Sequence, residues 1–76
     1  MKVKITVSFK KGIFNPEGDT ILRTLNKIGY ENVKKVGIER SFILELSEEM
    51  PEEKINEIAQ NILSNPVIED YTVTKE

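Results

Sequence analysis

The 76-residue sequence contains no cysteine, no histidine and no tryptophan. Without cysteine the chain has no disulfide, no thiolate nucleophile and no zinc finger of the usual kind. Without histidine it lacks the commonest metal ligand and proton shuttle. These absences argue against independent catalysis, and we expect no catalytic, cofactor-binding or metal-binding residue in this chain.

The short length predicts a single domain over residues 1–76, because domains usually span roughly 100 to 200 residues. A core in a chain this small rarely contributes more than about 3 to 5 kcal/mol of stability. We therefore expect the missing stabilisation to come from association with a second copy or with another protein.

Long hydrophobic runs are also absent. No segment approaches the roughly 20 apolar residues that cross a bilayer, and the first residues lack the apolar stretch of an export signal. The sequence thus predicts a cytoplasmic protein with no membrane partner.

The charge of the chain is polarised. Residues 1–40 hold nine basic and four acidic side chains, whereas residues 41–76 hold two basic and nine acidic side chains. Such polarity favours complementary association.

The first half of the sequence predicts a strand followed by a helix. Residues 2–10 alternate apolar and polar side chains, which is typical of a half-buried strand. Asn15 is a suitable helix cap and Pro16 suits a first helical position. Gly18 weakens this first turn, so a later start at Asp19 or Thr20 stays open. The apolar stripe that follows ends near Gly29, a favourable residue beyond a helix C-terminus.

The second half predicts three more strands and a helix. Residues 32–40 and 42–46 are expected to form a hairpin that turns near residues 39–41, although no typical turn dipeptide marks it. Pro51 opens a helix with an apolar stripe at helical spacing, and Pro66 stops it. Residues 67–75 form the last strand.

The order β-α-β-β-α-β predicts an α+β, ferredoxin-like sandwich, with a four-stranded antiparallel sheet and both helices on one face. The apolar strand 42–46 is the best candidate for a central strand. The open face of the sheet is expected to be polar, lined by Lys2, Lys4, Thr6, Ser8, Ile43, Glu45, Thr72 and Thr74.

This open face argues against nucleic acid as a partner. RNA-binding sheets stack bases on aromatic rings, whereas the face here carries lysines, threonines and the carboxylate of Glu45.

The adjacent carboxylates Glu69 and Asp70 are poorly placed as an acid–base pair, because neighbours in a strand point to opposite faces. We interpret them as surface or capping groups, and Arg40 near the predicted hairpin as solvated or as an interface residue.

Three segments in order resemble the small PurS-type subunit of phosphoribosylformylglycinamidine synthase, also called formylglycinamide ribonucleotide amidotransferase. They are residues 14–18 (FNPEG), 25–30 (LNKIGY) and 65–71 (NPVIEDY). The resemblance extends over the whole chain. It implies a ferredoxin-like subunit of a ligase in de novo purine biosynthesis that forms a homodimer or a dimer of dimers.

The resemblance further implies that this subunit bridges a glutaminase subunit and a large synthetase subunit and assists ammonia transfer. ATP and magnesium would be used by the synthetase, and no cofactor by this chain. We expect the partner-facing residues to be Asn15, Pro16, Gly18, Arg40, Asn65, Pro66, Glu69, Asp70 and Tyr71. Turn and capping roles explain several of these residues equally well.

Two alternatives remain open at this point. An amino-acid-sensing regulatory domain has the same order of elements and binds small effectors at dimer interfaces. The glycine-containing loop before the first helix is compatible with that function. A purely structural dimerisation module is the other alternative.

Overall fold

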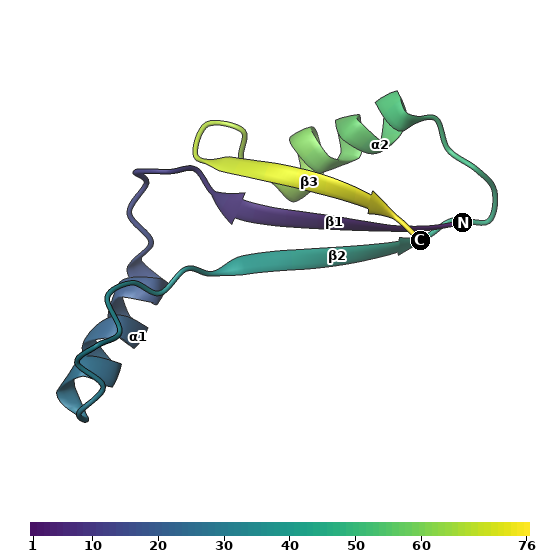
Figure 1. The fold of residues 1–76 in the computed structure, drawn as a ribbon. Helices are drawn as coiled ribbons and strands as arrows, with labels where there is room; N and C mark the ends of the chain where they lie inside the picture. Colours follow the sequence, from purple (N-terminus) through teal and green to yellow (C-terminus); the bar gives the residue numbers. More distant parts are fainter.

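The computed structural model describes all of residues 1–76. The elements are β1 (Lys2–Phe9), α1 (Pro16–Lys27), β2 (Glu39–Glu45), α2 (Glu52–Ile58), the π-helical turn η1 (Ala59–Leu63) and β3 (Glu69–Lys75). The three strands form one antiparallel sheet in the order β2-β1-β3 (Figure 1). The chain is thus α+β, with β1 at the centre of the sheet.

The alternation in β1 divides the sheet into an inner and an outer face. Val3, Ile5 and Val7 are buried on the inner face. On the outer face Lys4 lies opposite Ile43 of β2, and Thr6 lies between Ser41 and Thr72. The predicted first strand and the predicted polar face are therefore confirmed.

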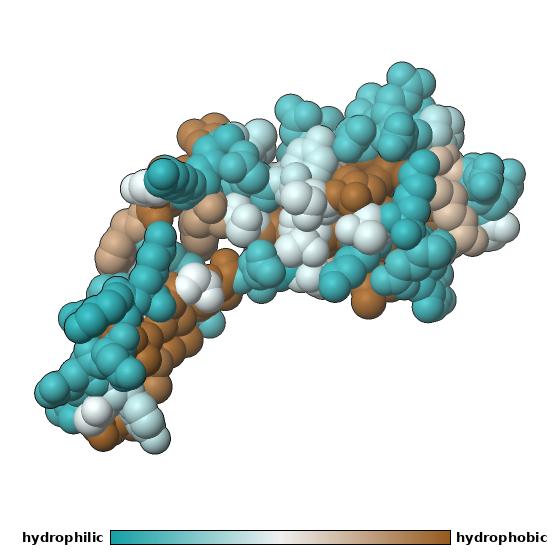
Figure 2. Space-filling view, viewed as in Figure 1, coloured by the Kyte–Doolittle hydropathy of each residue, from teal (hydrophilic) through white to brown (hydrophobic).

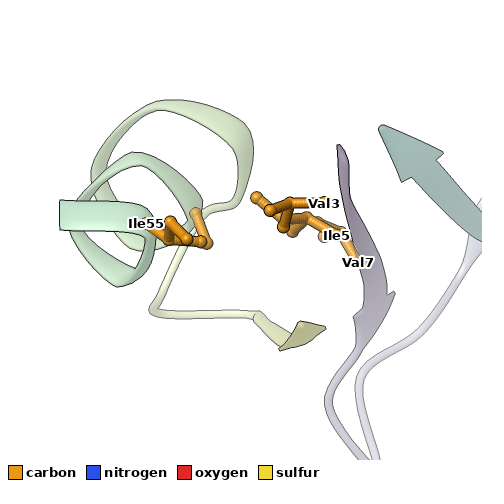
Figure 3. Packing of buried hydrophobic residues seen from close by; sticks show 5 residues of the cluster. Val3, Ile5, Val7 and Ile55 are labelled. Carbon is orange, nitrogen blue, oxygen red and sulfur yellow. The ribbon is translucent and has the colours of Figure 1, made fainter. Parts of the chain in front are cut away.

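A small core lies between the sheet and α2 (Figure 3). Ile55 of α2 and Ala59 of η1 pack on the three buried side chains of β1. Half-buried side chains surround this cluster: Phe42, Leu44, Leu46, Met50, Leu63, Tyr71 and Val73. Only five hydrophobic residues are fully enclosed, so the chain has little of the apolar burial that stabilises a domain.

The predicted first helix is confirmed, and it begins at Pro16, so the later start at Asp19 or Thr20 is wrong. Asn15 caps α1, Pro16 occupies its first turn, and Gly29 follows it with φ of +112°. However, α1 lies beyond the end of the sheet instead of on it, and residues 28–38 return alongside the helix (Figure 1). We call residues 10–38 the arm.

The predicted hairpin of residues 32–40 and 42–46 is wrong. Glu39–Glu45 is one continuous strand, and residues 33–38 have no regular structure. A strand requires a neighbouring strand for its backbone hydrogen bonds. No strand of the sheet lies beside residues 33–38.

Two further expectations fail for the same reason. β2, which contains residues 42–45, is an edge strand and not a central one, and only α2 with η1 covers the inner face. A single chain therefore has three strands of the four expected for the ferredoxin-like sandwich. The last strand begins at Glu69 instead of residue 67, because residues 65–68 form a turn.

Both ends of the chain lie at the end of the sheet opposite the arm (Figure 1). The Met1 ammonium group donates to the Leu46 carbonyl at 3.2 Å, and the Glu76 N–H donates to the Lys2 carbonyl at 2.9 Å. None of the helices has the length and apolar character needed to cross a membrane.

Candidate partner interface

The residues expected to face a partner fall into two groups. Asn15, Pro16 and Gly18 lie where the arm enters α1. The sheet-end group lies where β2 and β3 meet the arm, and it consists of Arg40, Asn65, Pro66, Glu69, Asp70 and Tyr71.

Local packing accounts for the first group. The Asn15 side chain accepts a hydrogen bond from the Gly18 N–H at 3.2 Å, which satisfies a free donor of the first helical turn. Gly18 is buried, and a Cβ atom placed on it would lie 2.5 Å from the Val36 carbonyl oxygen. Glycine therefore allows the returning chain to lie directly against α1.

A tight turn positions the start of β3. The Asn65 side chain accepts from the Val67 N–H at 3.1 Å, and its backbone carbonyl accepts from the Glu69 N–H at 2.7 Å. In return, the Glu69 carboxylate accepts from the Asn65 N–H at 2.8 Å. Pro66 is exposed in the middle of this turn. Residues 65–68, which begin one of the three segments that resemble the family, thus form a turn closed by its own hydrogen bonds.

Glu69 also joins the two edge strands across β1. Arg40 Nη2 donates to Glu69 Oε2 at 3.2 Å, and the guanidinium group lies 5.8 Å from the centre of the Phe42 ring. The Glu69 side chain is only 10% exposed, whereas that of Arg40 is 60% exposed. One face of the guanidinium group therefore remains open to solvent or to a partner.

The neighbouring carboxylate has a different partner. Lys10 Nζ donates to Asp70 Oδ1 at 2.8 Å, so Asp70 pairs with a residue just after β1 and Glu69 with a residue of β2, which agrees with opposite orientations of neighbours in a strand. Tyr71 is half-buried, and its hydroxyl donates to Asn56 Oδ1 of α2 at 3.3 Å. Tyr71 therefore joins β3 to the helix.

A recess of about 360 Å³ separates the two groups of residues. Glu17 of α1 and Ile38 line it on the arm side, and Val7, Arg40 and Glu69 line it on the sheet side. A second recess of about 380 Å³ lies between the two connections of the arm and includes Lys10, Lys11 and Lys35. The structure thus brings Arg40 and Glu69 together and places the α1 entry across an open gap.

The sequence interpretation missed the exposed hydrophobic side chains of the arm. Phe14 and Ile28 are 67% and 65% exposed, and Ile21 is 41% exposed. The apolar stripe within residues 21–28 correctly predicted α1, but the predicted sandwich placed this helix on the sheet. Figure 2 shows hydrophobic atoms gathered along the arm. No group of three or more potential metal ligands occurs among the acidic residues.

The comparison with protein families shows to which family the chain belongs. The family model described as "PurS: Phosphoribosylformylglycinamidine (FGAM) synthase" matches residues 2–76. The chain belongs to the PurS family. The PurS match extends over α1, both edge strands and the turn at Asn65, so it includes all the residues of the candidate interface.

Individual PurS proteins agree in sequence and in fold. The PurS subunit of Methanocaldococcus jannaschii is 38% identical over 78 residues, which cover 99% of this chain and 94% of that protein. The structure of Bacillus subtilis PurS has a TM-score of 0.88 at 29% identity and covers 99% of this chain and 98% of its own. A chain in the structure described as PurLQS from Thermotoga maritima has a TM-score of 0.79 at 32% identity, with 99% and 95% covered.

Proposed function

We propose that this chain is the small, non-catalytic subunit of a phosphoribosylformylglycinamidine synthase. It bridges the glutaminase and synthetase subunits and assists the transfer of ammonia between them. In the reaction, ammonia released from glutamine converts formylglycinamide ribonucleotide to the amidine in the cytoplasm. ATP and magnesium are used by the synthetase subunit, and this chain holds no cofactor of its own. The observation that carries the proposal is the PurS family match over residues 2–76.

The similarity to a chain in the Thermotoga maritima PurLQS structure supports a role within an assembly. The residue types agree with that role. A bridging subunit requires binding surfaces, whereas a nucleophile or proton shuttle such as cysteine or histidine would have to come from its partners.

The sheet-end group is the proposed partner-facing surface. Arg40 presents an open guanidinium face, and arginine is enriched among residues that dominate binding energy. Pro66 is exposed on the closed turn, and Asp70 is exposed at the start of β3. Because internal hydrogen bonds already hold this turn, a partner would bind it without a large ordering cost.

We also propose that the subunit works as a homodimer or as a dimer of dimers. A core of five buried hydrophobic residues is too small to stabilise the chain by itself. Self-association supplies the burial that the single chain lacks.

Reconstitution tests the proposed function. The chain is mixed with the glutaminase and the synthetase of the same source, and amidine formation is followed with either glutamine or ammonium chloride as the nitrogen donor. We expect glutamine-dependent synthesis to require the chain, and ammonia-dependent synthesis to proceed without it. Equal glutamine-dependent rates with and without the chain would contradict the proposal.

A further inference from the structure

The recess between the two connections of the arm has the size of a ligand site. Its volume is about 380 Å³, within the range of pockets that bind small molecules. Residues 8–13 with Asn15 line one side, and residues 35–39 line the other. Figure 2 shows the surface open between the arm and the sheet. Two segments far apart in the sequence therefore enclose one space.

Positive charge predominates in this recess. Lys10, Lys11 and Lys35 line it, and Glu39 is the only carboxylate among the lining residues. Lys10 is paired with Asp70 at 2.8 Å, but neither Lys11 nor Lys35 lies within 4.0 Å of a carboxylate oxygen. Two unpaired ammonium groups, one from each connection, attract an anion, because the walls of a recess concentrate their field.

Uncharged donors belong to the same lining residues. The backbone N–H groups of residues 35–38 donate no hydrogen bond within the chain. The Asn15 side chain uses its oxygen to accept from the Gly18 N–H, which leaves its NH₂ group available as a donor. Gly12, with φ of +86°, has no side chain to fill the recess. The lining residues therefore have both charged and uncharged donors available for an oxyanion.

These donors suit a phosphate monoester better than a carboxylate. A phosphate monoester carries about −1.5 to −2 charges at neutral pH and three strong acceptor oxygens, so it can bind Lys11 and Lys35 together. Lysine binds phosphate as a compact point charge. The recess is larger than a phosphate ion requires, so an organic group attached to the phosphate would occupy the rest.

The remaining walls suit a ribonucleoside. The Glu39 carboxylate is an acceptor for sugar hydroxyl groups, the role that an acidic residue has in dinucleotide-binding folds. Phe9 and Ile13 provide an apolar wall for a base, and bases stack on aromatic rings. The only acidic group of the recess thereby has a role that a simple anion would not give it.

We propose that the recess binds a ribonucleotide 5′-monophosphate, with its phosphate on Lys11 and Lys35 and its ribose hydroxyl groups on Glu39. The bound ligand joins the two connections of the arm, so it restrains the arm relative to the sheet. This inference goes beyond the synthase role and does not depend on it.

Calorimetric titration of the purified chain with adenosine 5′-monophosphate provides the first test. We expect saturable binding with a Kd of about 100 μM, binding of inorganic phosphate that is about tenfold weaker, and no binding of adenosine. Lys35→Gln should weaken binding of the monophosphate about tenfold, because a charge-assisted contact is lost. Lys34→Gln is the matched control, because Lys34 is also exposed but does not line the recess, and Kd should change less than about twofold. Circular dichroism verifies that both variants fold.

Glu39→Ala distinguishes a ribonucleotide site from a general anion site. It should weaken binding of adenosine 5′-monophosphate about fivefold, because the ribose hydroxyl groups lose a charged acceptor. Binding of inorganic phosphate should stay the same or tighten, because the removed carboxylate repels it. Absence of saturable heat, equal affinities for the monophosphate and inorganic phosphate, or equal effects of Lys34→Gln and Lys35→Gln would overturn the proposal. The synthase role is decided separately by the reconstitution.

Discussion

Arg40 and Glu69 form an ion pair of 3.2 Å that joins the two edge strands of the sheet across β1. The pair lies at the end of the sheet where the arm begins, and Glu69 also accepts the Asn65 N–H of the preceding turn. The nearly buried carboxylate of Glu69 therefore links β3 to β2 and also closes the turn that begins at Asn65, where we place part of the partner surface.

Replacing this carboxylate should destabilise the chain. We expect Glu69→Ala to lower the free energy of unfolding by about 1 to 2 kcal/mol, because two hydrogen bonds to a charged acceptor are lost while Arg40 remains solvated. Urea unfolding measures the change. Glu45→Ala is the control, because Glu45 is 80% exposed and lies 3.9 Å from Lys2. A similar loss in both variants would show that the Arg40 pair has no special role.

The close approach at Gly18 can be tested by adding a methyl group. A Cβ atom there would lie 2.5 Å from the Val36 carbonyl oxygen, so Gly18→Ala should cost about 1 to 3 kcal/mol through overpacking. Gly37→Ala meets nothing within 4 Å and should be close to neutral. Thermal unfolding followed by circular dichroism compares the two variants, and equal midpoints would contradict the packing described for the arm.

The two faces of the sheet should respond differently to the same substitution. Ile5→Ala removes a fully buried side chain of the central strand and should cost about 2 to 5 kcal/mol. Ile43→Ala on the outer face, where the side chain is 60% exposed, should cost less than about 0.5 kcal/mol. Unfolding at equilibrium gives both values. A large cost at Ile43 would indicate that the outer face is also covered in solution.

Partner binding should depend on Asp70 more than on other acidic residues. Asp70 is 64% exposed, so Asp70→Ala should leave the fold intact while weakening assembly with the glutaminase and synthetase about tenfold or more. Co-purification and glutamine-dependent synthesis are the measurements. Glu49→Ala, at an exposed position before α2, is the matched control. Unchanged assembly with Asp70→Ala and Glu69→Ala combined would refute the sheet-end group as the partner surface.

The amino-acid-sensing alternative predicts that the chain itself binds a small molecule. Its best location is the recess beside Lys10, Lys11 and Lys35. Calorimetry of the purified chain with individual amino acids should show no saturable heat at micromolar concentrations if the chain is a bridging subunit. Saturable binding would favour the sensor.

Local signals in the sequence predicted the elements that depend on neighbouring residues. The alternation around Ile5 defined β1, and Asn15, Pro16 and Gly29 defined the limits of α1. The opposite orientations of Glu69 and Asp70 followed from strand geometry alone.

The arrangement of the arm was not predictable in the same way. An apolar stripe such as that of Ile21 and Ile28 indicates that a helix face will be covered, but not by which surface. The strand predicted at residues 32–40 failed because strand formation depends on a neighbouring ladder, which this chain does not provide. The proposed interface at Arg40 and Asp70 remains a prediction.

The positions of the two ends have a practical consequence for experiments. Met1 and Glu76 lie together at the end of the sheet farthest from α1 (Figure 1). An affinity tag or fluorescent protein attached at either end would therefore project away from both the arm and the Arg40–Glu69 pair. A short linker between the end of one copy and the start of another would join two chains into a tandem polypeptide with both arms left free.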